Sequence, residues 1–144
     1  MHGINFSEEL EKIVAKDPRY TGEAYLFVRE ALDHTQKTIG RPAKDDDTPR
    51  HVSGQQLLDG IREYALLQYG PMALTLLHEW GIHRCEDFGE IVFNMVENSL
   101  LAKTEQDSRD DFKGRYGFEE AFRKPFLPSD RLPKLETPGE LKNA

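Results

Sequence analysis

Five neighbouring side chains in the middle of the chain could bind a metal: His78, Glu79, His83, Cys85 and Asp87. Imidazole, thiolate and carboxylate groups are the ligands that zinc takes in proteins. The spacing argues against a zinc site, because His78 and His83 are five residues apart with Gly81 between them and should not share one helix face. It matches neither an HExxH helix nor paired CxxC knuckles. We therefore expect exposed histidines at a helix–helix corner, a half-buried cysteine, and no bound metal or other cofactor.

Cys85 could also serve as a nucleophile. It lies just before a predicted helix N-terminus, where the helix macrodipole lowers the pKa of a thiol. The candidate bases are His51, His78 and His83. A catalytic Cys–His pair also needs a group that orients the base and a site for the oxyanion, and the sequence shows neither. We expect Cys85 to be a small residue beside a helix cap.

Two acidic clusters have a simpler explanation than catalysis or cation binding. Residues 45–47 are three consecutive aspartates, without the alternating oxygen ligands and central glycine of an EF-hand loop. The second cluster comprises Glu105, Asp107, Arg109, Asp110 and Asp111. General acid–base catalysis needs two carboxylates in different environments, whereas a stretch this polar leaves its carboxylates solvated. The chain also lacks a glycine-rich phosphate loop and a GxSxG motif, so we expect no enzymatic activity.

Composition narrows the class of protein further. A chain of 144 residues corresponds to one domain with a real core. Its net charge of −7 disfavours binding to nucleic acid or anionic membranes, although a local basic face would still permit nucleic-acid binding. A single cysteine cannot form an intramolecular disulfide. Neither a signal-peptide pattern nor an apolar run near ~20 residues is present, so we expect a cytoplasmic protein without a membrane span.

Two helices are predicted in the N-terminal third of the chain. Asn5 and Glu8 can form a capping box at the start of the first helix, which should end at 17–18 because the residue before proline avoids the α region. Thr21 is the expected N-cap of the second helix. Gly40 fits its C-terminal end, where glycine adopts a positive φ without strain. The inward stripe of the second helix is Ala24, Tyr25, Val28, Ala31, Leu32 and Thr35.

The third helix has the clearest start in the sequence. Ser53 and Gln56 fit an S-x-x-Q capping box, and Val52 and Leu57 fit the hydrophobic staple that accompanies it. The predicted inward face of this helix consists of Leu57, Leu58, Ile61, Tyr64 and Ala65.

Two further helices should follow a sharp turn at Gly70-Pro71. Residues 71–80 are apolar nearly all round, which predicts a central and largely buried helix closed by Gly81. The fifth helix should run over 87–98, with Asp87 and Glu90 as its capping box. Phe88, Ile91, Val92, Met95 and Val96 should line its inner face.

The order and lengths of the last three predicted helices resemble those of a winged-helix core. Residues 100–104 could extend the fifth helix or pair with 111–116 in a small β-hairpin, which would be the wing. In such a domain the last helix enters the DNA major groove. Its outward residues here would be Glu86, Asp87, Glu90, Asn94, Glu97 and Asn98. Four of these are acidic and would oppose a phosphate backbone, so contact with a protein is the better use of this scaffold.

The expected architecture is therefore a mainly α single domain of about five helices over 1–124, with a mobile acidic loop at 41–50. Residues 125–144 are rich in proline and are expected to be disordered.

Arg50 and His51 precede the third helix, where acidic residues are usual, and an ion pair with the acidic loop is the simplest explanation. Four residues that folding does not explain form the candidate partner-binding surface: Arg50, His51, His83 and Arg84.

Five segments of the sequence resemble a bacterial family that is associated with Verrucomicrobia and Planctomycetes. They are DPRYTGEAYLFVREAL, RHVSGQQLLDGIREYAL, YGPMALTLLHEWGI, EDFGEIVFNMVENSLLAKTEQDSRDDF and FEEAFRKPF, and together they extend over about residues 4–127. The resemblance implies a bacterial, cytoplasmic protein and carries over no activity, cofactor or catalytic residue. The family pattern has threonine near the position of Cys85, which weakens both cysteine-based hypotheses.

The leading hypothesis is a non-enzymatic module that binds another protein or regulates it. A winged-helix-like regulator associated with nucleic acid is the alternative, and an enzyme or metal-binding protein is third.

Overall fold

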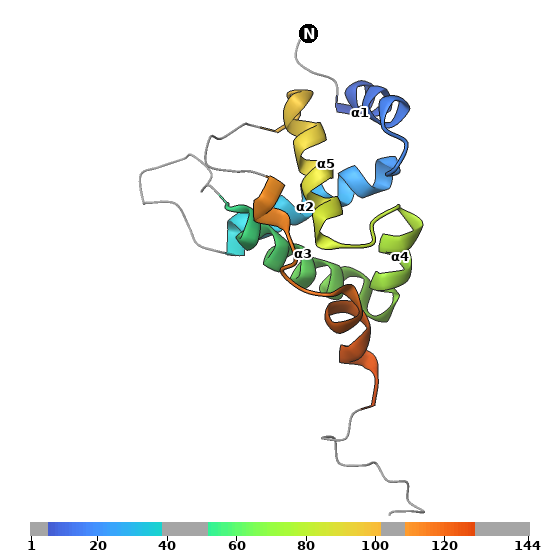
Figure 1. Ribbon diagram of the computed structural model, residues 1–144, viewed down its shortest axis with the longest axis vertical. Coiled ribbons are helices and arrows are strands. Elements are labelled where there is room, and N and C mark those ends of the chain that lie inside the picture. Colours follow the sequence, from blue (N-terminus) through green and yellow to red (C-terminus); the bar gives the residue numbers. More distant parts are fainter. Residues whose placement is uncertain (1–5, 39–51, 102–108, 129–144) are drawn as a thin grey trace, which may run out of the picture.

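Two antiparallel helices, α2 (Gly22–Thr38) and α3 (Gly54–Tyr69), form the centre of the fold (Figure 1). The computed structural model describes residues 6–38, 52–101 and 109–128, which contain five α-helices joined by shorter helical turns. Phe27 packs against Tyr69 whereas Thr35 lies against Gly60, so the two helices run in opposite directions. The predicted mainly helical fold is confirmed.

The two central helices touch at Gly60. A Cβ atom at this position would overlap the side chain of Thr35, so only glycine permits this approach. Thr35 is itself buried, and its hydroxyl donates to the carbonyl of Ala31 at 2.7 Å. The threonine hydroxyl is satisfied within its own helix, and the whole side chain, hydroxyl and methyl group alike, lies against Gly60 of α3.

Helices α1 (Phe6–Lys16) and α5 (Cys85–Glu97) pack against α2 and complete the core. Helix α1 contributes Leu10 and Ile13, which are buried. Helix α5 buries Phe88, Ile91 and Met95, which belong to the predicted inner face. The core is therefore formed by one face of each helix, as the helical periodicity predicts.

The start of α3 is the predicted one. The backbone N–H of Gln56 donates to Ser53 Oγ at 3.1 Å, and the backbone N–H of Ser53 donates to Gln56 Oε1 at 3.0 Å. Both members of the predicted staple, Val52 and Leu57, are buried in the core. The capping box is confirmed because its two hydrogen bonds join residues only three apart and need no tertiary contact.

The predicted side-chain cap at Thr21 is wrong. Its backbone carbonyl accepts from Ala24 N–H at 3.0 Å, and its own N–H donates to the carbonyl of Trp80 at 3.2 Å. Its hydroxyl oxygen is buried and has no hydrogen-bond partner in the described part of the chain. The bond to Trp80 holds the backbone at this corner, and the side chain faces packed atoms instead of the helix end. Asn5 and Gly40, the other predicted helix ends, lie outside the described residues.

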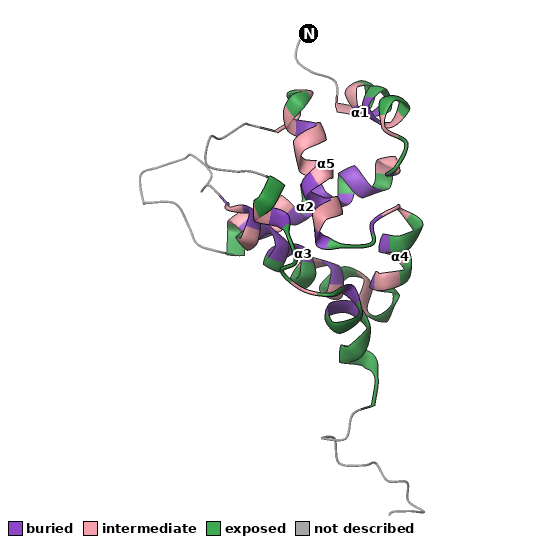
Figure 2. Ribbon diagram, viewed as in Figure 1, coloured by how far each residue is buried: buried purple, intermediate pink, exposed green. Residues whose placement is uncertain are grey.

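Residues 71–80 do not form a central helix. A 3-10 turn, η1 (Gly70–Met72), leads into the short helix α4 (Ala73–Glu79), in which only Ala73 and Leu77 are buried. Most of α4 is exposed or intermediate (Figure 2). The sharp turn at Gly70 places α4 at one end of α3, where only one of its faces finds a partner. An apolar composition therefore overstated how deeply this helix is buried.

The predicted start of the fifth helix is also wrong. Helix α5 begins at Cys85, and Asp87 is its third residue. The carboxylate of Asp87 points back to accept the backbone N–H groups of His83 at 2.8 Å and Arg84 at 3.2 Å. Asp87 thus caps the helix from within its first turn and does not pair with Glu90.

The structure contradicts the β-hairpin and the winged-helix core. The described residues contain no strand, and 111–112, the start of the second predicted strand, belong to the 3-10 turn η2 (Arg109–Phe112). The backbone carbonyl of Asp111 accepts from the Gln55 side chain at 2.6 Å, and Phe112 packs directly on Gly89 of α5. Contacts with α3 and α5, and not pairing with a strand, hold this segment. Residues 102–108 of the proposed hairpin lie outside the described residues.

The C-terminal segment is held against α3 by side chains that are distant in the sequence. Arg115 forms a bidentate pair with Asp59 at 3.0 and 2.8 Å, and the Tyr116 hydroxyl donates to the carbonyl of Leu58 at 2.7 Å. The π-helical turn η3 (Glu119–Arg123) buries Ala121 and Phe122, and the 3-10 turn η4 (Lys124–Phe126) follows it.

Residues 125–128, the start of the proline-rich tail, are exposed, whereas 129–144 and the acidic loop at 41–50 lie outside the described residues. None of the described helices has the length and apolar character needed to cross a membrane.

Candidate functional site

The polar face of α5 is turned toward the corner between α1 and α2. Arg19 binds Asp17 through Nε at 2.8 Å and Nη2 at 2.7 Å, and it also reaches Glu90 at 3.3 Å. Asn94 donates to both Asp17 Oδ2 at 3.0 Å and Tyr25 Oη at 2.9 Å. The hydrogen bond from the Arg19 side chain holds the pKa of Asp17 well below its usual range. Two residues predicted to face outward on a recognition helix, Glu90 and Asn94, instead join parts of the fold.

Cys85 does not have the environment of a nucleophile. Its side chain is 1% exposed, more buried than the half-buried cysteine that the sequence predicts. Its Sγ donates to the carbonyl of Tyr116 at 3.4 Å, and burial raises the pKa of the thiol. Desolvation of the thiolate therefore outweighs the lowering expected from the helix N-terminus.

The two histidines of the predicted corner lie together. The imidazole rings of His78 and His83 have centroids 4.8 Å apart and planes tilted by 39°, although the sequence spacing indicated that they would not share a face. The chain reverses direction at Gly81, which has a φ of +95°, and this reversal brings them onto one side. Both side chains are exposed. Within the described residues, no three histidine, cysteine or carboxylate side chains gather as a metal site would require.

Several of the remaining predicted site residues lie outside the part of the chain that the structure describes. Arg84 is exposed at the start of α5, whereas Arg50 and His51 lie outside the described residues, as do 45–47, Glu105 and Asp107. Arg109 pairs with Glu90 at 3.2 Å, and Asp110 pairs with Lys113 at 3.3 Å. Among the described residues that the sequence singled out for chemistry, the structure places the side chains of His78 and His83 together, and it joins Asp87 to the backbone of His83 and Arg84.

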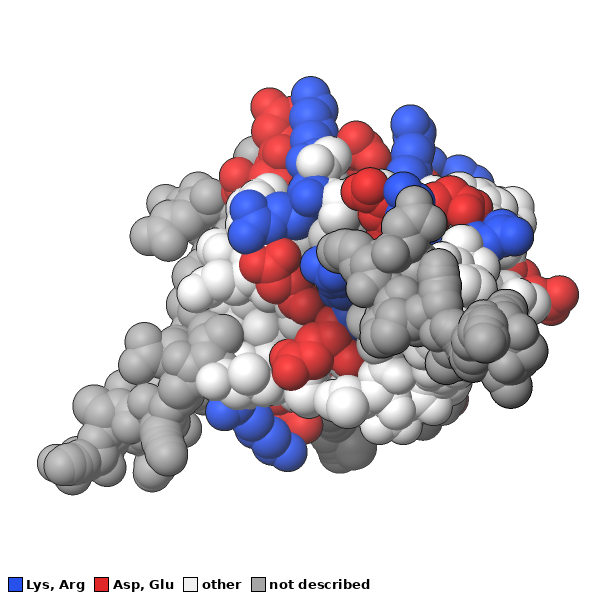
Figure 3. Space-filling model, turned by 90° about the horizontal axis from the view of Figure 1, so that it is seen from below, with Lys and Arg blue, Asp and Glu red and all other residues white. Residues whose placement is uncertain are grey.

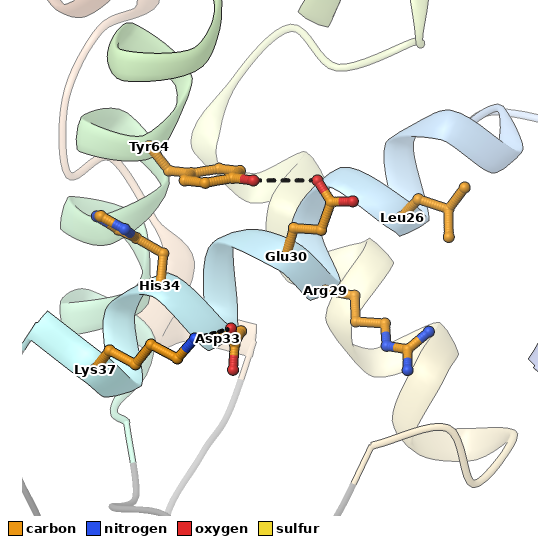
Figure 4. Close-up of a pocket in the computed structure, with 7 residues that line it drawn as sticks. All are labelled: Leu26, Arg29, Glu30, Asp33, His34, Lys37 and Tyr64. Carbon is orange, nitrogen blue, oxygen red and sulfur yellow. Dashed lines mark hydrogen bonds and ion pairs between the residues drawn. The ribbon is translucent and has the colours of Figure 1, made fainter.

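A groove that the sequence did not predict lies on the outer side of α2 and α3. It has a volume of about 540 Å³, and Figure 4 shows the side chains that line it. They are Leu26, Arg29, Glu30, Asp33, His34 and Lys37 from α2 and Tyr64 from α3. We call this depression the α2–α3 groove.

Short polar contacts hold most of the charged groups of the α2–α3 groove. Tyr64 reaches across from α3 and donates its hydroxyl to Glu30 Oε1 at 3.2 Å (Figure 4). Burial, followed by the charge of Glu30, raises the pKa of Tyr64. Lys37 pairs with Asp33 at 3.0 Å on α2. These contacts engage Glu30, Asp33 and Lys37 within the groove.

His34 connects the two walls of the groove. Its Nε2 lies 3.3 Å from Glu63 Oε1, and its ring lies 5.2 Å from the Tyr64 ring between centroids. The histidine thus has both a polar and an aromatic partner on α3.

Leu26 and Arg29 have no such polar partner among the residues that the structure describes. The side chain of Leu26 is 41% exposed, although it is a large apolar residue. The Arg29 guanidinium stacks over the Phe6 ring at 4.2 Å, and it makes no ion pair with the residues that the structure describes. One apolar and one cationic group of the groove are therefore available to a ligand.

The sequence did contain one signal for this groove. The lining residues of α2 recur every three or four positions, so they share one helix face, and Leu26 is an apolar residue outside the predicted buried stripe. The contribution of Tyr64 was hidden, because its position predicts an inward-facing core residue.

Comparisons with models of known protein families, with curated proteins and with solved structures found no match.

Proposed function

We propose that this protein is a non-enzymatic interaction module that binds an amphipathic helical segment of another protein in the α2–α3 groove. The observation that carries the proposal is the exposed Leu26, which lines the same groove as Tyr64 together with charged side chains of both signs. Protein interfaces combine an apolar or aromatic centre with a polar rim. A groove formed by two antiparallel helices can receive a third helix that presents its apolar face.

The charges of the groove indicate what the bound segment should carry. Glu30 already accepts from Tyr64, Asp33 is paired with Lys37, and His34 is paired with Glu63. Arg29 lacks an ion-pair partner among the described residues and is one helical turn from Leu26. The complementary segment therefore has an apolar residue over Leu26 and a carboxylate that reaches Arg29, since arginine binds carboxylates in a bidentate manner.

Two observations favour a protein ligand over nucleic acid. Lys and Arg side chains are interspersed with Asp and Glu over the face shown in Figure 3, whereas a binding site for nucleic acid needs a basic patch or stripe. Two of the α5 residues that a winged-helix protein would present to DNA are engaged within the fold instead, Glu90 with Arg19 and Asn94 with Asp17. The setting that we propose is the bacterial cytoplasm, on the strength of the family resemblance described above.

Selection of peptides tests this proposal without knowledge of the natural partner. A phage-displayed library of amphipathic helical peptides would be selected on the immobilised chain, and calorimetry would give the affinity of each selected peptide. We expect peptides with an apolar residue and an acidic residue about one turn apart. Leu26→Glu should weaken them by at least about tenfold, as expected for a residue at the centre of an interface.

The matched control is Leu127→Glu, because Leu127 is 47% exposed and lies outside the groove. This variant should bind the selected peptides like the unmodified chain. Arg29→Glu should weaken binding of the acidic peptides and reverse the effect of salt on their affinity, because it replaces an attraction by a repulsion. Failure to enrich any peptide, or peptides that bind the Leu26 and Arg29 variants as tightly as the unmodified chain, would refute the proposed site.

A further inference from the structure

We propose that His78 and His83 together bind a divalent transition-metal ion of the Zn²⁺ class. Their rings lie side by side on the surface, with centroids 4.8 Å apart. His78 belongs to α4 and His83 to the turn before α5. The fold of the corner between them holds the two backbone positions close together.

A Schellman motif fixes the end of α4 next to His78. The N–H of Gly81 donates to the carbonyl of His78 at 3.0 Å, and the N–H of Ile82 donates to the carbonyl of Leu77 at 2.8 Å. This is the hydrogen-bond pair that ends a helix with a glycine of positive φ. Ile82 is fully buried, so the chain cannot swing outward after the turn.

The backbone of His83 is fixed from the other side. Its N–H donates to Asp87 Oδ2 at 2.8 Å, and the hydroxyl of Tyr20 holds the other carboxylate oxygen at 2.7 Å. Both histidines therefore project from backbone positions that hydrogen bonds hold in place. A pair of imidazoles on a fixed backbone loses less conformational entropy on binding an ion than a pair on a loose loop.

The side chains themselves can adjust to an ion. Two bonds of about 2.0–2.1 Å to zinc place the coordinating nitrogens roughly 3.3 Å apart. The ring centroids are already 4.8 Å apart, and the exposure of both side chains permits the rotations that would turn one nitrogen of each ring toward a shared ion. Cys85 is bonded to Tyr116 and Asp87 to the helix cap, and no third histidine, cysteine or carboxylate of the described residues is placed to complete a metal site.

The site thus supplies two imidazole ligands and leaves the other positions of the ion to water or to donors of a second molecule. Imidazole suits Zn²⁺, Ni²⁺ and Cu²⁺, whereas Mg²⁺ and Ca²⁺ prefer oxygen ligands. We expect the first group of ions to bind and Mg²⁺ not to bind.

The test uses the full chain without a histidine tag and stripped of metal. Calorimetric titration with ZnCl₂ should show one ion per chain, and the imidazole NMR signals of His78 and His83 should shift on its addition. His78→Ala and His83→Ala should each lower the affinity by roughly tenfold or more, because each removes one of two ligands. Circular dichroism of the metal-free variants checks that they fold.

His34→Ala is the matched control, since His34 is a histidine of a different surface and is paired with Glu63. It should bind zinc like the unmodified chain. Zinc binding of unchanged affinity in the double variant His78→Ala/His83→Ala would assign the ion to other residues and overturn the proposal. Absence of heat and of NMR shifts at millimolar zinc would overturn it as well.

Discussion

Replacement of Gly81 by alanine should destabilise the protein far more than the same replacement at Gly114. Both glycines have a positive φ, +95° at Gly81 and +51° at Gly114. An L residue in this region costs about 1–2 kcal/mol of conformational free energy. The two positions differ in their surroundings: a Cβ at Gly81 would overlap the carbonyl of Arg19, whereas a Cβ at Gly114 would meet nothing within 4 Å.

The overlap at Gly81 cannot be relieved by rotation of a side chain, because the obstacle is backbone. Overpacking of this kind costs about 1–3 kcal/mol. We therefore expect Gly81→Ala to lower the free energy of unfolding by about 2–5 kcal/mol, and Gly114→Ala by about 1–2 kcal/mol. The loss at Gly81 is a large part of the total stability of a typical domain, about 5–15 kcal/mol.

Urea denaturation followed by far-ultraviolet circular dichroism would measure both variants. Fluorescence of Trp80 is less suitable as the main probe, because Trp80 is adjacent to the mutated residue. The slope of the free energy against urea should be unchanged, so that the midpoints report stability alone. If the two variants lose the same free energy to within about 0.5 kcal/mol, the close approach of Gly81 to the Arg19 carbonyl does not contribute and the reasoning is refuted.

Two further predictions concern Asp17 and Cys85. Asp17→Asn should lower the free energy of unfolding by about 1 kcal/mol at neutral pH. This is the low end of the range for charged hydrogen bonds, because the Arg19 side chain is 55% exposed and water screens the pair. The folded-state pKa of Asp17 lies below its unfolded value, so its contribution is present above that unfolded value and is lost as the pH falls through the folded pKa. The urea midpoints of the unmodified chain and the Asp17→Asn variant should therefore begin to converge below about pH 4. A difference that stays constant down to about pH 2 would contradict this role. Cys85 should react with a thiol reagent at pH 8 roughly 100-fold or more slowly in the native chain than in urea, since its thiol is buried and its pKa is raised. Equal rates in the two states would show that the thiol is accessible.

The helix starts and faces that depend on near neighbours could be predicted from the sequence. The capping box of Ser53 and Gln56 joins residues three apart, and its geometry follows from the chain itself. The buried face of α5, with Phe88, Ile91 and Met95, follows from the helical period. The sequence was less informative about how deeply a helix is buried. It predicted a largely buried helix over 71–80, although only Ala73 and Leu77 of α4 are buried.

The features that could carry function depend on contacts between distant residues. The α2–α3 groove exists because Gly60 lets α2 and α3 approach closely enough for Tyr64 to reach Glu30. Asp87 caps its helix backward because Tyr20, which is 67 positions away in the sequence, holds the carboxylate. No local pattern encodes which of several polar partners a side chain will meet.

The sequence by itself determined that this is a mainly helical chain and where several helices begin, because hydrogen bonds and periodicity within a few residues decide those features. It also placed Gly81 at the end of the fourth helix. Only the tertiary structure decided the consequence of that glycine: its positive φ turns the chain back so that His78 and His83 meet, while the Arg19 carbonyl leaves no room for another residue. The physical reason is that the direction of a chain after a turn depends on what packs around the turn.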